Sequence, residues 1–297
     1  MMTIDPKEIP VAKLHGYLLG AVAPRPIALV STVDAEGRDN LSPFSFFNVF
    51  SANPPIAIFS PARRGRDNTT KHTYENVKVH AECVINIVNY EMVQQMSLSS
   101  TEYPAGVSEF VKSGLTPLDS VKISPKRVAE SPVQLECQVQ QVIELGKEGG
   151  AGNLIVCHIV QIHIAEDVID ANGRIDPYLI DQVSRMGGDW YSRARLGMFE
   201  VPKPLERCGI GVDQLPSDIR FSKVLTGNHL GMLGNTEQMP NETDVNEYKL
   251  TELSELFLEL SDDAEGLERA LHQRAAVLLN QNKIQEAWMT LLSFNAG

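Results

Sequence analysis

Residues 24–33 read Pro-Arg-Pro-Ile-Ala-Leu-Val-Ser-Thr-Val, and this stretch decides the fold. Its apolar and β-branched part ends at Asp34-Ala35-Glu36-Gly37, which has the composition of a turn. Residues 40–48 then interleave small polar groups with aromatic ones, and residues 54–60 open another short strand. The order predicts a strand, a polar turn, a strand, a loop and a further strand ending near Val88.

Four cations follow the last of these short strands within nine positions: Arg63, Arg64, Arg66 and Lys71. They stand out because the chain carries 38 acidic against 26 basic side chains, a formal charge of −12. A solvated loop is one interpretation of the cluster, and a phosphate site is the other. A planar aromatic cofactor with a phosphate needs hydrogen-bond donors, apolar walls and cations, and residues 24–88 supply that mixture.

In order and spacing, these motifs resemble the flavin reductase-like family of FMN-binding split β-barrels. The resemblance spans about two-thirds of the chain and rests on Arg25-Pro26-Ile27, Thr32-Val33-Asp34 with Gly37, Asn40, Ser42 to Phe46, Asn53-Pro54-Pro55, Lys71 with Thr73 and Asn76, Val84 to Ile87, Gly106 to Phe110, Ser131-Pro132-Val133 with Leu135-Glu136-Cys137, and Arg185 to Gly188 with Tyr191. The family's lysine is commonly followed by Asp-Thr, and here His72 stands in the Asp place.

The resemblance implies a mostly β fold with α: an FMN-binding split β-barrel with peripheral helices. Two prolines at Val201-Pro202-Lys203-Pro204 suggest a boundary, so we expect the barrel over residues 1–204 and a C-terminal extension over residues 205–297. Residues 209–240 show little periodicity, which predicts an irregular wrap around a surface or a partner subunit. Helices are expected beyond it: residues 244–260 with Leu250, Leu253, Phe257 and Leu260 on one stripe, a second from a capping box of Asp262 and Glu265 to Leu279, and a third over residues 285–292.

The resemblance also implies site residues. Flavin contacts fall on Thr32, Ser42, Pro43, Ser45 and Phe46, and phosphate contacts on Ser60, Arg63, Lys71 and Thr73. Arg185, Gly188 and Tyr191 either line a groove for the nicotinamide or only pack. Arg25 either joins the site or pins the strand entrance. Hydride transfer from a nicotinamide stacked on the flavin is a proximity effect, so no catalytic side chain is assigned.

Local patterns predict further elements. Helices are expected at residues 11–19, 70–77 (capped by Thr69 or Thr70), 90–99 and 107–113. Val133, Leu135, Cys137 and Val139 alternate with Gln134, Glu136, Gln138 and Gln140, which predicts a strand with one wet face. The glycine-rich residues 146–152 lead into a strand, so a hairpin turn is favoured over a phosphate loop. Residues 154–164 are apolar almost throughout and predict a strand covered on both sides.

Several classes of protein are disfavoured. The seven histidines show no metal-ligand spacing, so no metal site is predicted, and neither a P-loop nor a Rossmann fingerprint is present. The negative charge argues against nucleic acid or an anionic membrane as partner. Four separated cysteines, an N-terminus unlike a signal peptide and no apolar run of ~20 residues predict a cytoplasmic protein.

Three functions stay open. The first is an NAD(P)H-dependent flavin oxidoreductase using FMN, with NADH or NADPH as donor. The second is a flavoredoxin-like electron carrier that passes electrons to a redox partner protein. The third is an oxidase of the pyridoxamine-phosphate type on a related barrel. The resemblance further implies a homodimer with flavin at the subunit interface.

Overall fold

The structure is a computed structural model that describes residues 1–104, 106–204 and 208–294. The chain divides into two compact units, Met1–Phe199 and Glu200–Gly297. The predicted boundary falls between residues 204 and 205, and residues 205–207 lie outside the described part of the chain.

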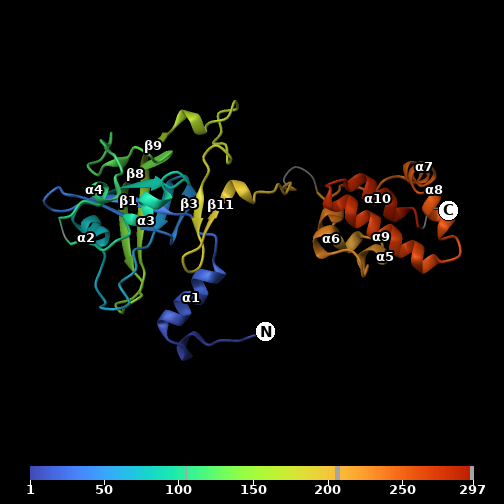
Figure 1. Ribbon diagram of the computed structural model, residues 1–297, viewed down its shortest axis with the longest axis horizontal. Helices are drawn as coiled ribbons and strands as arrows, with labels where there is room; N and C mark the ends of the chain where they lie inside the picture. The colour runs from blue at the N-terminus through green and yellow to red at the C-terminus, as the bar shows by residue number, and fades with distance from the viewer. Residues whose placement is uncertain (105, 205–207, 295–297) are drawn as a thin grey trace. The chain divides into compact units, whose positions relative to one another are not determined.

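The first unit is built around a seven-stranded sheet in which all neighbouring strands run antiparallel (Figure 1). The strands follow the order β2-β1-β5-β8-β9-β4-β3. Their bounds are β1 (Ala28–Val33), β2 (Asp39–Phe44), β3 (Phe47–Ala52), β4 (Pro55–Phe59), β5 (Glu82–Ile87), β8 (Val133–Glu144) and β9 (Asn153–Ile164). Two short ladders accompany the sheet: β6 (Pro117–Leu118) with β7 (Arg127–Val128), and β10 (Val183–Arg185) with β11 (Tyr191–Arg193).

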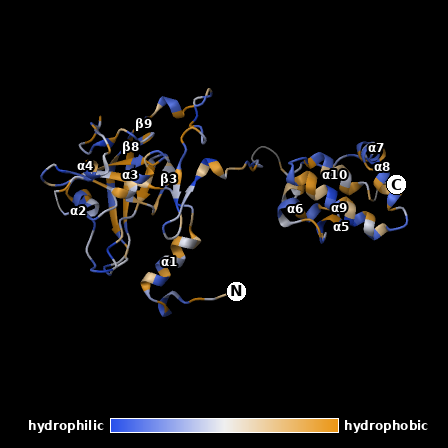
Figure 2. Ribbon diagram, viewed as in Figure 1, coloured by the Kyte–Doolittle hydropathy of each residue, from blue (hydrophilic) through white to orange (hydrophobic). Residues whose placement is uncertain are grey.

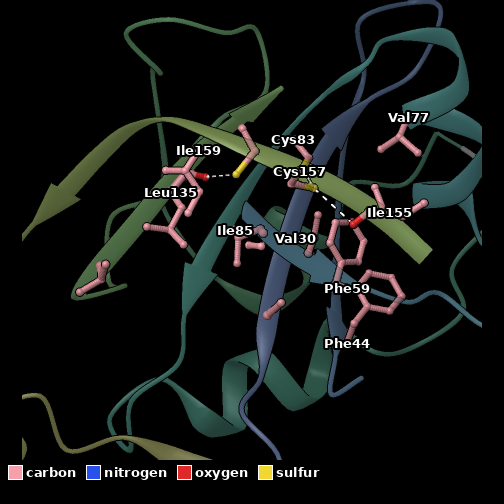
Figure 3. Packing of buried hydrophobic residues seen from close by; sticks show 14 of the residues in the cluster. Val30, Phe44, Phe59, Val77, Cys83, Ile85, Leu135, Ile155, Cys157 and Ile159 are labelled. Atoms are coloured by element: carbon pink, nitrogen blue, oxygen red, sulfur yellow. Dashed lines mark hydrogen bonds between the residues drawn. The ribbon is translucent and has the colours of Figure 1, made fainter. Parts of the chain in front are cut away.

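Strand β1 is buried along its whole length because both faces of the sheet are covered. Ala28 and Val30 belong to the cluster drawn in Figure 3, where the rings of Phe44 and Phe59 pack with centroids 5.4 Å apart. Leu29 points to the other face, into a second cluster that includes Met96 of helix α3 (Val93–Leu98) and Phe110 of helix α4 (Glu109–Ser113). Burial on both faces explains why this strand lacks the polar alternation of a half-exposed one.

The cysteines of the barrel behave as small apolar residues. Cys83, Cys137 and Cys157 are free and buried, and the Sγ atoms of Cys83 and Cys157 lie 3.7 Å apart (Figure 3). Cys208, the fourth cysteine, is free and exposed.

Strands β8 and β9 form a long hairpin, which confirms the turn predicted at residues 146–152. Gly150 has φ +90°, a conformation that favours glycine. A Cβ added to Gly152 would lie 2.9 Å from Ser60 Oγ, and one on Gly149 would lie 3.1 Å from the carbonyl oxygen of Arg64. The glycines therefore let this turn pack closely against the loop that follows β4.

The prediction that one face of β8 is exposed to solvent is wrong for the first half of the strand. Gln134 and Glu136 are buried, and only Gln138 and Gln140 of that face are exposed. The Glu136 carboxylate accepts hydrogen bonds from the main-chain N–H groups of Val121 and Lys122, at 2.8 and 2.7 Å. A buried carboxylate is tolerated because these donors replace its water.

Strand β9 is also less covered than predicted. Its first residues alternate between buried and partly buried positions, while Ile162 and Ile164 near its end are exposed. The apolar run therefore marks a strand whose second face is only partly covered.

The helices of this unit are α1 (Val11–Ala21), α2 (His72–Val79), α3 (Val93–Leu98) and α4 (Glu109–Ser113), and the last three contact strands of the sheet. Helix α2 begins one residue after its N-cap Lys71, and no side chain caps it. The predicted caps are therefore wrong: Thr70 Oγ1 instead donates to Glu75. Within the part of the chain that the structure describes, 3-10 turns lie at Pro6–Glu8, Glu166–Val168, Ala194–Leu196 and Val212–Gln214.

The second unit is helical and has its own core. Its helices are α5 (Ser217–Arg220), α6 (Gly227–Gly234), α7 (Glu242–Glu252), α8 (Ser254–Glu259), α9 (Ala264–Asn280) and α10 (Ile284–Leu292). Ile219 and Leu233 pack with Trp288 and Leu291 in one cluster, and apolar residues run along α10 in Figure 2. The prediction of an irregular wrap at residues 209–240 is wrong, because α5 and α6 form part of this core.

Two local predictions for these helices also need correction. The helix expected over residues 244–260 breaks at Leu253, so Leu250 is 74% exposed while Leu253 is buried. The cap of α9 is Asp263, whose carboxylate accepts from Gly266 N–H at 2.9 Å, in place of the predicted capping box. Within the described residues, every helix is too short or too polar to cross a bilayer.

A buried histidine makes the stability of the second unit depend on pH. Ser222 Oγ accepts from the N–H groups of Val224 and Leu225, both at 3.1 Å. Its own proton is therefore directed to Nδ1 of His272, 2.8 Å away, which must be unprotonated. Burial lowers the pKa of His272 against the opposing charges of Glu268 and Asp218.

The pKa of His272 is lower in the folded protein than in the unfolded chain. Its contribution to the free energy of unfolding is therefore complete above the ordinary histidine pKa of about 6.5, and it is lost as the pH falls below that value. We expect the melting temperature to fall between pH 7.5 and pH 5.5. His272→Gln should cost about 1–3 kcal/mol at pH 7.5, because it disrupts a buried hydrogen bond, and should flatten that dependence. Calorimetry of both proteins measures this, and equal slopes would contradict it.

Candidate functional site

The predicted flavin segment lies at one edge of the sheet and continues into the turn between β2 and β3. Ser42 and Pro43 are half-buried on β2, Ser45 is half-buried in the turn, and Phe46 beside it is exposed. The N–H of Ser60, at the end of β4, donates to the carbonyl of Phe46 at 2.9 Å. Pairing of β3 with β4 thus places a predicted phosphate residue next to the predicted flavin segment.

The basic loop brings its cations together on one carboxylate. Glu102 accepts hydrogen bonds from Arg64 Nε at 2.7 Å, from Lys71 Nζ at 3.3 Å and from Arg66. These charge-assisted bonds, led by the one from Arg64, lower the pKa of Glu102 to about 2. Three cations that converge on one anion form a cluster whose charge suits a phosphate.

Helix α2 begins at this cation cluster, which we define as Arg64, Arg66 and Lys71. Lys71 is the N-cap residue, and no side chain caps the helix. First-turn amides and the positive end of the helix dipole favour anions, so the helix adds to the field of the cluster. Ser42 and Lys71 line one small cavity of about 30 Å³, whose wall also includes Glu102 and Glu109.

Arg63 does not join the cluster, contrary to prediction. Its guanidinium donates to Asn68 Oδ1 and to the carbonyl oxygen of Asn68, both at 2.6 Å, and its N–H donates to Ala151 at 2.8 Å. Arg63 therefore stabilises the loop, whereas Arg64 contacts Glu102 together with Arg66 and Lys71.

The two predicted threonines are buried beneath the loop. Thr32 Oγ1 accepts from Asn40 Nδ2 at 3.3 Å and from Asn76 Nδ2 at 3.0 Å. Asn40 Nδ2 also donates to Thr73 Oγ1 at 3.0 Å. Since Thr32 and Thr73 are fully buried, we assign them the role of fixing α2 against β1 and β2.

Glu109 is a further residue that sequence reasoning missed. It is buried, and its Oε2 accepts from the N–H of Leu41 at 3.0 Å, next to Ser42. Burial raises its pKa against the opposing effects of Leu41 N–H and His72. Neither Glu102 nor Glu109 could be found by spacing, because their partners lie some 30 to 70 positions away in the chain.

The three predicted groove residues share the β10–β11 hairpin. Arg185 is half-buried with its Cζ atom 4.6 Å from the centre of the Tyr191 ring, and Gly188 sits in the turn with φ +58°. Arg25 reaches the same hairpin: its side chain donates to Met186 O at 2.9 Å and to Ser45 Oγ at 3.4 Å. Arg25 therefore ties the predicted flavin segment to the predicted groove.

No group of three or more His, Cys, Asp or Glu side chains in the described ranges could hold a metal ion.

Residues 20–184 match the family described as flavin reductase like domain. The chain belongs to the flavin reductase-like family. Its fold is the split barrel of that family, as the resemblance predicted.

Individual relatives agree with this assignment. An uncharacterized protein of Halalkalibacterium halodurans is 36% identical over 65% of this chain and 92% of its own length. Among solved structures, nitrilotriacetate monooxygenase component B from Bacillus cereus is 31% identical with a TM-score of 0.64, covering 68% of this chain and 98% of that one. The 2-nitrobenzoate 2-nitroreductase of Pseudomonas fluorescens is 25% identical with a TM-score of 0.62, covering 73% and 99%.

The residues present fit the flavin that the family implies. The cation cluster and the start of α2 suit a phosphate, and the Ser42–Phe46 segment offers hydroxyl and aromatic groups beside it. Asn40 Oδ1 is buried next to this region without a hydrogen-bond partner among the described residues. Family and site together support a flavin-binding, oxidoreductase-like role.

The cation cluster can be tested by comparing FMN with riboflavin, which lacks the phosphate. Lys71→Ala should weaken FMN binding by about 1–3 kcal/mol, the range for a lost charge-assisted hydrogen bond, and should change riboflavin binding far less. Glu102→Gln should act in the opposite direction, because it removes the carboxylate that competes for the same cations. Titration of flavin fluorescence measures all four affinities.

Lys78→Ala is the matched control, since Lys78 lies on the same helix but contacts Tyr74 and Glu144. It should leave both affinities unchanged. Equal losses of FMN and riboflavin in Lys71→Ala would remove the phosphate from this position.

Proposed function

We propose that this protein is an FMN-binding oxidoreductase that transfers hydride between a nicotinamide, NADH or NADPH, and flavin. The observation that carries the proposal is the convergence of Arg64, Arg66 and Lys71 at the start of α2, beside the Ser42–Phe46 segment. A flavin that carries a phosphate suits both features, because its phosphate matches the cations and its ring matches the hydroxyl and aromatic groups of the Ser42–Phe46 segment. FMN, when bound, supplies a ring that accepts a hydride.

The chain's own residues act by placing the reactants. The cluster holds the phosphate, and the threonine–asparagine network beneath it keeps α2 in place. The hairpin with Arg185 and Tyr191 is positioned to bound the space for the second reactant, since Arg25 fixes it to Ser45. Orientation of two rings is sufficient for hydride transfer, so no side-chain acid or base is needed.

The test is spectroscopic and then kinetic. The purified protein should show the absorbance bands of oxidised flavin and release FMN on denaturation. With added FMN it should oxidise NADH or NADPH, and comparison of the two donors sets the preference. FMN binding without oxidation of either donor would contradict the reductase activity.

The second candidate is an electron-transfer flavoprotein that passes electrons to a partner protein. The similarity to a structure named as one component of a monooxygenase favours this alternative. Reduction of bound FMN by a chemical reductant, with no turnover of nicotinamide, would point to it. The match of residues 20–184 lends no support to an oxidase of the pyridoxamine-phosphate type.

We also propose a homodimer, because the first unit exposes apolar side chains around Phe46. Val49 and Phe50 on the edge strand β3 are exposed. Helix α1 buries none of its residues, and His15 on that helix packs against Phe46 with ring centroids 6.1 Å apart. A second copy of the chain would cover this face and lie next to the flavin segment.

Light scattering should therefore give twice 32.8 kDa. Phe50→Asp should weaken the dimer by roughly tenfold or more, because one buried aromatic contributes about 1.5–3 kcal/mol. Val111→Asp is the control, since Val111 is also an exposed apolar residue but lies on α4. A monomeric wild-type protein at micromolar concentration would refute the homodimer.

A further inference from the structure

Arg185, at the turn end of β10, and Arg25, which is bridged to it, lack an acidic partner among the described residues. Arg25 N–H donates to Arg185 O at 2.9 Å, and Arg185 N–H donates to Arg25 O at 2.8 Å, so their main chains are held together. Within residues 1–104, 106–204 and 208–294, neither guanidinium pairs with a carboxylate. The charges stand close enough that Arg185 lowers the pKa of Arg25, after the larger effect of burial.

Other arginines of the same segment have an acidic partner. Arg193 on β11 donates to both carboxylate oxygens of Asp181, at 2.9 and 3.0 Å from Nε, and Arg195 lies 3.2 Å from the same carboxylate. The contrast is informative because the net charge of the chain is −12 and acidic side chains are abundant. The neighbouring Arg193 and Arg195 share one carboxylate, whereas no carboxylate among the described residues pairs with Arg25 or Arg185.

Arg25 is the buried member of the pair. It is 5% exposed, and its NH1 atom donates to the carbonyl oxygens of Leu19 and Val22, at 2.6 and 2.7 Å. With Met186 O and Ser45 Oγ, these partners solvate the guanidinium but carry no full negative charge. A buried cation without a counter-ion is costly, and a bound anion offsets that cost.

Arg185 is the accessible member, and its surroundings are rigid. Its guanidinium stacks on Tyr191, with Cζ 4.6 Å from the ring centre. The turn of the hairpin packs on α1, because a Cβ added to Gly187 would lie 3.3 Å from Gly20 Cα. Arg185 is thus presented from a fixed support, which limits the entropy lost on binding.

We propose that Arg185, with Arg25 behind it, binds an oxyanion of the substrate that exchanges electrons with flavin. This rests on the proposed function, because Ser45, which Arg25 contacts, belongs to the flavin segment. The oxyanion is either the carboxylate of an organic acceptor or a phosphate of the nicotinamide donor, and both suit the two-pronged donors of a guanidinium.

The experiment titrates the FMN-loaded full-length protein with benzoate and with benzamide, which has the same ring but no charge. Binding is followed by flavin absorbance and by the fluorescence of Trp190, which is exposed in the same hairpin. We expect benzoate to bind roughly tenfold more tightly than benzamide. Arg185→Gln should abolish this difference, and Arg185→Lys should restore part of it.

Arg193→Gln is the matched control, because it removes an arginine of the same hairpin while Arg195 still pairs with Asp181. It should keep the preference for benzoate. Pyrophosphate is tested separately, in competition with NADH. If pyrophosphate competes in the wild-type protein but not in Arg185→Gln, and benzoate does not bind, the oxyanion is the phosphate of the donor.

The proposal is overturned if neither benzoate nor pyrophosphate binds, or if Arg193→Gln reduces binding as much as Arg185→Gln. Failure of the proposed function shows separately. A protein that takes up no FMN, but whose Trp190 fluorescence still reports a preference for benzoate, refutes the flavin assignment and leaves the anion site standing.

Discussion

The pairing of β8 with β9 is the constraint on which the barrel depends. The two strands pair over twelve residues each, and each also pairs with a second strand, β5 on one side and β4 on the other. This arrangement joins the strands before and after the basic loop into one sheet. The turn of the hairpin then packs on that loop through Gly149 and Gly152. Hydrogen bonds of the sheet therefore position the cations of the cluster, although Arg64, Arg66 and Lys71 all lie outside the strands.

Two groups of cations in the barrel differ in the partners that surround them. At the start of α2, Glu102 pairs with Arg64, Arg66 and Lys71, so its single negative charge offsets only part of theirs, and a bound anion would compete with it for the same cations. At the hairpin, Arg25 and Arg185 have only dipoles and an aromatic ring as partners among the described residues. Electrostatics thus distinguishes two anion-binding regions, one on each side of the Ser42–Phe46 segment in the proposed arrangement.

The second unit has the physical basis for independent stability. Its core gathers Leu233, Leu279 and Trp288, and the indole N–H of Trp288 donates to Thr236 at 3.1 Å, so its polar atom is satisfied in the interior. None of its residues falls within the segment that matches the family. Its polar contacts, including Ser222 with His272, join residues of this unit to one another.

The sequence by itself determined the local elements and the family. Strands β1, β4 and β9 follow from short apolar runs, the hairpin after β8 from its glycines, and helix α9 from apolar residues spaced three or four positions apart. All of these signals depend only on neighbours in the chain. The tertiary structure decided what depends on distant partners. It buried Thr32 and Thr73, replaced Arg63 by Arg64 in the cluster, and brought Glu102 and Glu109 to the site. It also folded residues 209–240 into a core that their glycine-rich composition concealed. The physical reason is the same in each case: burial and charge pairing are set by side chains tens of residues away, which no local pattern specifies.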